Sequence, residues 1–128
     1  MRNTIIDYYL GGHGPTIYIG VKSMEWLVHL KNSISQLNDG VVSCVNFNRF
    51  ENIEISGIKT FELVKVAQSP SIMLHGDGKD GANIVWSQDS EGLKNILGLI
   101  DILIEKDMQS HQYLAEDGVL LIELSYKE

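Results

Sequence analysis

The amino-acid sequence predicts an α+β domain in which two α-helices pack on one face of an antiparallel β-sheet. Short runs of β-branched and aromatic residues recur between Gly, Pro and Asn breaks, a pattern typical of strands. Two longer segments have apolar residues at spacings of three and four, which is typical of amphipathic helices. With 128 residues, of which 44% are hydrophobic and 21% charged, the chain fits a single domain over residues 1–128.

The first predicted unit is a β-hairpin followed by a helix. Residues 4–10 and 16–21 read as strands joined by the turn Gly11-Gly-His-Gly-Pro15, because glycine tolerates positive φ and proline fixes its own φ. Ser23 is the predicted N-cap, and Asn38-Asp-Gly40 ends the helix. The apolar face of this helix contains Leu27, Leu30, Ile34 and Leu37.

The second predicted unit repeats this plan. Residues 82–86 read as a strand after a second glycine-rich turn, and Asp89 or Ser90 caps the next helix. The apolar stripe of this helix is broad, which predicts burial on two sides or a contact between two copies in a homodimer. It contains Leu93, Ile96, Leu97, Leu99, Ile100, Ile102, Leu103 and Ile104. A shift of 66 residues superposes the two units, which are either a duplication or two ordinary ββα pieces.

The remaining segments read as short strands and a loop. Between the first helix and the second glycine-rich turn, breaks at Asn, Gly and Pro separate four runs, which we expect to pair as antiparallel strands. These runs are residues 41–47, 52–56, 60–67 and 71–75. After the second helix we expect a loop over residues 110–117 and a closing strand over residues 118–125.

Composition narrows the class of partner. Seventeen acidic and ten basic side chains give a formal net charge of −7, which disfavours nucleic acid and anionic membrane and favours a basic protein. No apolar run reaches the roughly 18 residues of a membrane-spanning helix, and residues 1–10 lack the pattern of a signal peptide. We therefore expect a cytoplasmic protein.

No motif in the sequence requires a particular reaction or cofactor. The glycine-rich turns lack the Lys-Ser/Thr of a phosphate-binding loop and lead into strands. The alternative interpretation is a small metal- or ligand-binding, enzyme-like domain that uses His75, Asp77 and His111, since imidazole and carboxylate bind zinc, iron or manganese. Their spacing matches no common metal motif, and Asp with Gly is also typical of hairpin turns.

One arrangement near the C-terminus resembles a known class of proteins. Over residues 82–126 an apolar helix is followed by a short His-containing segment, His111-Gln-Tyr-Leu114, and a terminal strand. This organisation, in a small acidic α+β protein, resembles bacterial immunity proteins that neutralise polymorphic toxins. The resemblance implies a non-catalytic protein that blocks a basic toxin by protein–protein contact. From the residues themselves, exposed acids are the candidate contacts, namely Glu51, Glu54, Asp77 and Asp80.

Overall fold

The computed structural model describes residues 3–12, 14–76, 81–118 and 120–128. Within them the chain forms nine strands, two α-helices and one 3₁₀ helix. In chain order these are β1 (Thr4–Gly11), β2 (Gly14–Val21), α1 (Met24–Asn38), β3 (Cys44–Asn46), η1 (Phe47–Arg49), β4 (Ile53–Ser56), β5 (Ile58–Lys65), β6 (Ser71–His75), β7 (Ala82–Gln88), α2 (Ser90–Lys106), β8 (Ser110–Glu116) and β9 (Leu121–Tyr126).

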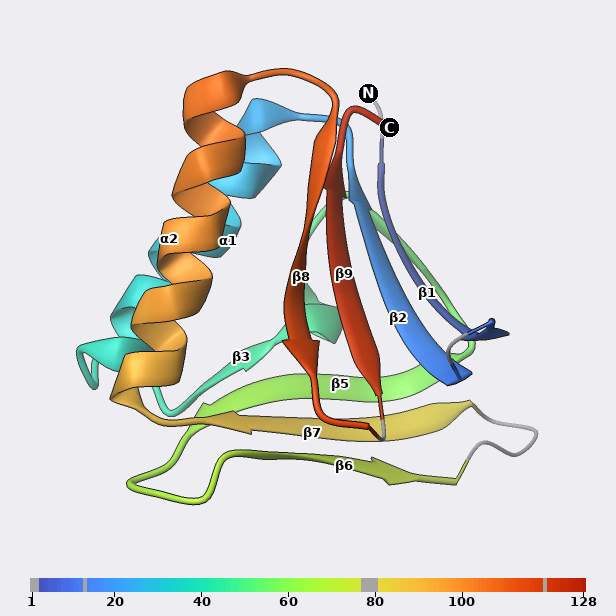
Figure 1. Ribbon diagram of the computed structural model, residues 1–128, viewed down its shortest axis with the longest axis vertical. Coiled ribbons are helices and arrows are strands. Elements are labelled where there is room, and N and C mark those ends of the chain that lie inside the picture. The colour runs from blue at the N-terminus through green and yellow to red at the C-terminus, as the bar shows by residue number, and fades with distance from the viewer. Residues whose placement is uncertain (1–2, 13, 77–80, 119) are drawn as a thin grey trace.

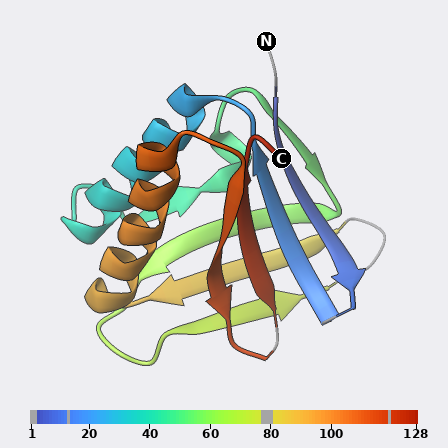
Figure 2. The ribbon, with the colours of Figure 1, turned by 45° about the horizontal axis from the view of Figure 1, so that its top comes forward.

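The strands form two sheets that cross each other, and the two helices stand side by side against them (Figures 1 and 2). One sheet has the order β4-β1-β2-β9-β8 and the other β3-β5-β7-β6. The α+β class is thus confirmed. The expectation of one antiparallel sheet is wrong, because β1 with β4, β2 with β9 and β5 with β7 are parallel pairs in two mixed sheets.

Both ββα units predicted from the sequence are present. The hairpin β1–β2 leads into α1, and the hairpin β6–β7 leads into α2. The two helices begin in the same way at positions 66 residues apart, since Ser23 Oγ accepts the backbone N–H of Trp26 and Asp89 Oδ1 accepts that of Gly92. The two superposed stripes are fully buried: Leu27, Leu30, Ile34 and Leu37 on α1, and Leu93, Ile96, Ile100 and Leu103 on α2.

Each helix is followed by strands that join the sheet of the other unit. The antiparallel pair β3–β5 lies beside β7, and the antiparallel pair β8–β9 lies beside β2. Without β4, one sheet has the order β1-β2-β9-β8 and the other has the order β6-β7-β5-β3. In each sheet the hairpin of one unit comes first, followed by the last and then the preceding strand of the other unit. The chain is thus built as two ββαββ units that exchange their C-terminal strand pairs.

One segment departs from this symmetric plan. Residues 47–57, which include η1 and β4, lie between β3 and β5. Residues 117–120 alone connect the equivalent strands β8 and β9. β4 adds to the free side of β1, so the inserted segment gives the first sheet its fifth strand.

Both sheets and both helices share one hydrophobic core. Its aromatic centre is a stack in which Phe47 and Phe61 have ring centroids 4.2 Å apart and Phe61 and Trp86 have centroids 6.4 Å apart. All three side chains are almost completely buried. The Nε1–H of Trp86 has no hydrogen-bond acceptor among the described residues, so the core contains an unsatisfied donor, which costs free energy.

Two further expectations differ from the structure. Residues 110–117 do not form a loop, since β8 occupies Ser110–Glu116. This strand lies at the edge of its sheet and only Leu114 is buried, so its sequence does not show the alternation of apolar residues that identifies a strand. The broad stripe of α2 is only partly used, because Leu99 packs against the core while Ile102 is 37% exposed. None of the helices in the described ranges is long and apolar enough to cross a membrane.

Candidate binding surface

The five-stranded sheet has one face on the core and one face directed outward. On β1 and β2, the paired residues Ile6 and Ile19 are fully buried. Because successive side chains of a strand point to opposite faces, their neighbours in sequence point outward. Ile5 and Tyr9 are accordingly 39% and 43% exposed.

Tyrosines and carboxylates alternate in one row across this outward face. The register aligns Asp7 of β1 with Tyr18 of β2, Tyr18 with Glu123 of β9, and Glu123 with Tyr113 of β8. With neighbouring strands about 4.8 Å apart, the row is about 14 Å long. Directly opposite residues of neighbouring strands lie close enough to act as one surface.

Further residues of the same kinds surround this row. Tyr9 lies on β1 and Glu116 near the end of β8, while Glu54 lies on β4 and accepts a 3.0 Å hydrogen bond from Asn3 Nδ2. We call the surface formed by these groups the tyrosine–carboxylate face. It comprises Asp7, Tyr9, Tyr18, Glu54, Tyr113, Glu116 and Glu123.

The ring of Tyr18 depends on a glycine in the same strand. A Cβ atom at Gly20 would lie 2.7 Å from Tyr18 Cε2 and 3.2 Å from its hydroxyl oxygen, so the ring lies over the backbone at Gly20. Glycine is therefore required at this position for the ring to lie flat along the sheet. The sequence thereby sets the orientation of one of the three tyrosines.

The five strands of this sheet contain acidic side chains but no Lys or Arg. All five strands lie within the described ranges. They contain four acids, of which Glu123 accepts a 2.9 Å hydrogen bond from Ser125 Oγ. An array of carboxylates without intervening cations produces a negative potential that attracts basic surfaces.

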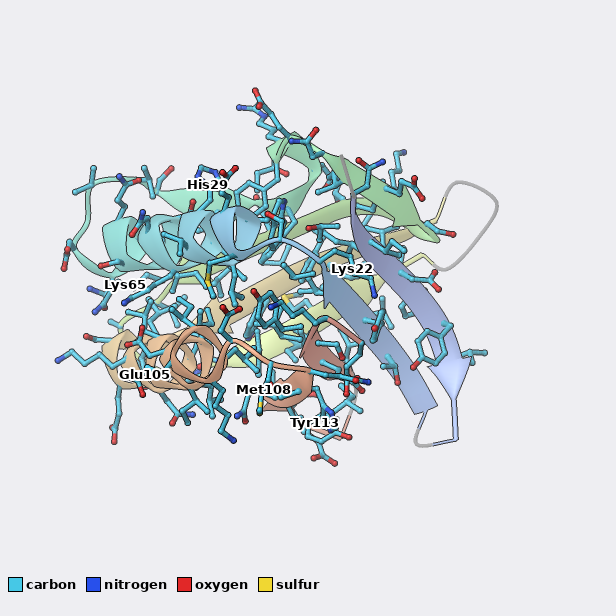
Figure 3. All side chains as sticks on the ribbon, turned by 90° about the horizontal axis from the view of Figure 1, so that it is seen from above. Lys22, His29, Lys65, Glu105, Met108 and Tyr113 are labelled. Atoms are coloured by element: carbon cyan, nitrogen blue, oxygen red, sulfur yellow. The ribbon has the colours of Figure 1, made fainter. Side chains whose placement is uncertain are left out.

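Two basic side chains lie beside these acids: Lys22 follows the end of β2, and His111 lies on β8 with its ring 5.5 Å from that of Tyr113. Lys22 contacts the main-chain oxygen of Glu128, and His111 Nδ1 lies 3.2 Å from Glu128 Oε2. Side-chain contacts of the Glu128 carboxyl with Ser125 and then with His111 outweigh the opposing effect of burial and lower its pKa. Figure 3 shows Lys22 and Tyr113 in well-separated positions.

The acids expected as contacts from the sequence lie in different places. Glu54 belongs to the tyrosine–carboxylate face. Glu51 is exposed but precedes β4, and its main-chain oxygen accepts the indole N–H of Trp26 at 3.3 Å. Asp77 and Asp80 lie outside the described residues.

The residues of the alternative metal site are not brought together on one sheet. His75 ends β6 in the four-stranded sheet, and His111 lies on β8 in the five-stranded sheet. Asp77 lies outside the described residues. Among the residues that are described, no group of three or more His, Cys, Asp or Glu side chains is arranged to hold a metal ion.

Most residues of the tyrosine–carboxylate face were not among the contacts predicted from the sequence. Asp7 and Tyr9 stand at alternate positions of an expected strand, and that alternation was the available signal. Their alignment with Glu123 could not be read from the sequence, because β2 and β9 are more than 100 residues apart in the chain.

A groove beside α1 is the second surface feature. Its wider hollow, with a volume of about 770 Å³, lies between the start of α1 and the segment that includes Arg49 and Phe50. A smaller hollow of about 300 Å³ continues past the same two residues toward Ser33 and Gln36. We call the two hollows together the α1 groove. Figure 3 shows His29, which lines the wider hollow, on the side of α1 that faces the green inserted segment.

The sequence matches no protein-family model, and comparisons with curated proteins and with solved structures found no significant similarity.

Proposed function

We propose that this protein is a non-catalytic binding protein that recognises a basic protein surface with its tyrosine–carboxylate face. In the most specific form of the proposal it is an immunity protein, and the partner is a basic toxin that it inhibits by contact. The observation that carries the proposal is the row of Asp7, Tyr18, Glu123 and Tyr113 on a sheet whose strands contain no Lys or Arg.

Both residue types in this row suit protein recognition. Tyrosine is enriched among the side chains that dominate binding energy, because it combines a large apolar ring with a hydroxyl group. Carboxylates on a surface of one sign accelerate association with a basic partner and exclude acidic ones. A sheet positions these groups rigidly, so little conformational entropy is lost when the partner binds.

The proposal is tested with two charge-matched double variants. Asp7→Asn with Glu123→Gln changes the face, whereas Glu62→Gln with Glu105→Gln removes two acids elsewhere, on β5 and α2. Both variants change the net charge from −7 to −5. Each tagged protein is used to capture a partner from the native cells, and the captured protein is identified and then expressed alone.

The expected partner is basic, is captured by the wild type and by the Glu62/Glu105 variant, and is captured poorly by the Asp7/Glu123 variant. For the immunity proposal, the partner expressed alone is toxic and the wild type relieves the toxicity. An acidic partner, or equal capture by both variants, contradicts recognition by this face. A basic partner without toxicity contradicts the immunity role and leaves recognition by the face supported.

A further inference from the structure

The α1 groove has an aromatic floor that the rest of the fold holds in place. Trp26 is 7% exposed and its ring meets that of Phe50 edge-on, with centroids 5.1 Å apart. His29 meets the same Phe50 ring at 5.2 Å. Phe50 is also in edge contact with Phe47, whose ring belongs to the core stack.

The wall opposite α1 is fixed by hydrogen bonds on both sides. The indole N–H of Trp26 donates to the main-chain oxygen of Glu51, and the backbone N–H of Thr4 donates to the main-chain oxygen of Asn52 at 2.8 Å. Earlier in this wall, Asn48 Oδ1 accepts the backbone N–H of Phe61 at 2.8 Å. The groove is therefore formed before any ligand binds, which lowers the entropic cost of binding.

The second half of the chain provides an internal comparison. Under the shift of 66 residues, Trp26 corresponds to Gly92 and His29 to Asn95. The opposite wall belongs to the segment 47–57, which has no counterpart between β8 and β9. The second unit forms its helix and strands without either wall, so these aromatic side chains are additions to the plan that the two units share.

The charges around the wider hollow favour a cation. Glu25 and Glu51 both line it and are exposed, and Arg49 lies where the two hollows meet. A hollow lined by aromatic rings and two carboxylates suits an arginine or lysine side chain, because aromatic rings and carboxylates both attract cations and the methylenes pack on the rings. Arg49 has donors suited to main-chain carbonyl groups of the same ligand.

The length of the groove suits an extended segment. It follows α1 from Ser23 to Gln36, a distance of about 20 Å at 1.5 Å per residue. An extended polypeptide spans this distance with about six residues. We infer that the α1 groove binds an extended segment of the basic partner and takes up one of its arginine or lysine side chains between Glu25 and Glu51, above Phe50. This inference rests on the proposed function for the identity of the partner.

The test uses the full-length protein and two end-blocked pentapeptides, Ala-Leu-Arg-Leu-Ala and Ala-Leu-Gln-Leu-Ala. Binding is followed by the NMR signal of the Trp26 indole N–H and by those of backbone amides along the groove. We expect the arginine peptide to shift these signals and to bind at least threefold more tightly than the glutamine peptide. The combined variant Glu25→Gln with Glu51→Gln should weaken the arginine peptide about two- to fivefold per carboxylate, with little change for the glutamine peptide.

The matched control is Glu62→Gln with Glu105→Gln, which makes the same change in net charge outside the groove. Equal affinities for the two peptides, shifts spread over the molecule, or an equal loss in the control would each overturn the inference. Phe50→Leu adds a test of the aromatic floor, with thermal unfolding to verify the fold; a folded Phe50→Leu protein that retains wild-type affinity also contradicts it. Failure of the peptides is distinguishable from failure of the proposed function, because the capture experiment depends on Asp7 and Glu123.

Discussion

Replacing Gly20 by alanine tests whether the orientation of Tyr18 matters for binding. The new Cβ would lie 2.7 Å from Tyr18 Cε2, and ordinary contacts begin at 3.4 Å, so the ring edge must move by about 0.7 Å. A Tyr side chain can yield by rotation, which costs about 0.5–1.5 kcal/mol if it leaves its rotamer. Alanine in a strand is favoured over glycine by about 0.5–1 kcal/mol. The two effects offset each other, and we expect the free energy of unfolding to stay within about 1 kcal/mol of the wild type.

The affinity for the partner should change more than the stability. Displacing a central tyrosine of an interface costs about 1–2 kcal/mol of binding free energy, which corresponds to a dissociation constant about five- to thirtyfold larger. Urea unfolding and calorimetric titration with the partner measure the two quantities. If Gly20→Ala shifts the Tyr18 ring signals in NMR spectra and the partner still binds with wild-type affinity, Tyr18 is not part of the interface.

Three further predictions concern stability. Gly98→Ala on α2, where a Cβ would meet nothing within 4 Å, should raise the free energy of unfolding by about 0.8–1 kcal/mol in urea denaturation; no gain would mean that Gly98 is needed for packing. Trp86→Phe removes the unsatisfied Nε1–H and should cost far less than the roughly 3–5 kcal/mol of Trp86→Ala; similar losses would show that the N–H is satisfied in solution. The Tyr126 hydroxyl donates to Asp107 Oδ1 at 2.7 Å, and burial, followed by this bond, raises the pKa of Tyr126 above 10.0. The stabilising effect of this hydrogen bond is therefore complete below pH 10 and is lost as pH rises through the raised pKa of Tyr126. Tyr126→Phe should be less stable than the wild type at pH 8, and the difference in the free energy of unfolding should shrink near pH 11. A difference that stays constant with pH would contradict this prediction.

The sequence predicted the features of the fold that depend on residues close together in the chain, namely helix caps, buried helix faces and buried strand faces. Ser23 and Asp89 cap their helices because a side-chain oxygen close in sequence reaches the free N–H groups of the first turn. The buried stripes follow from helical spacing alone. Strand alternation likewise identifies which residues share a face, as it does for Ile6 in β1.

Strand partners could not be predicted in this way. Alternation gives the buried face of a strand, but it does not say which strand lies beside it. The exchange of β3–β5 and β8–β9 between units places strands next to partners far away in the chain. The tyrosine–carboxylate face depends on that exchange, since Glu123 and Tyr113 reach Asp7 only because β9 pairs with β2. The α1 groove was missed for a related reason, because the segment around Phe50 contacts α1 only in the folded protein.

The most direct test of recognition by the tyrosine–carboxylate face is the affinity for the identified partner as a function of salt. We compare the wild type, Asp7→Asn with Glu123→Gln, and the charge-matched Glu62→Gln with Glu105→Gln. Charge-steered binding weakens as salt shortens the Debye length from about 10 Å at 0.1 M to 3 Å at 1 M. We predict a steep salt dependence for the wild type and the control and a shallower one for the Asp7/Glu123 variant. The same salt dependence in all three proteins would contradict recognition through this face.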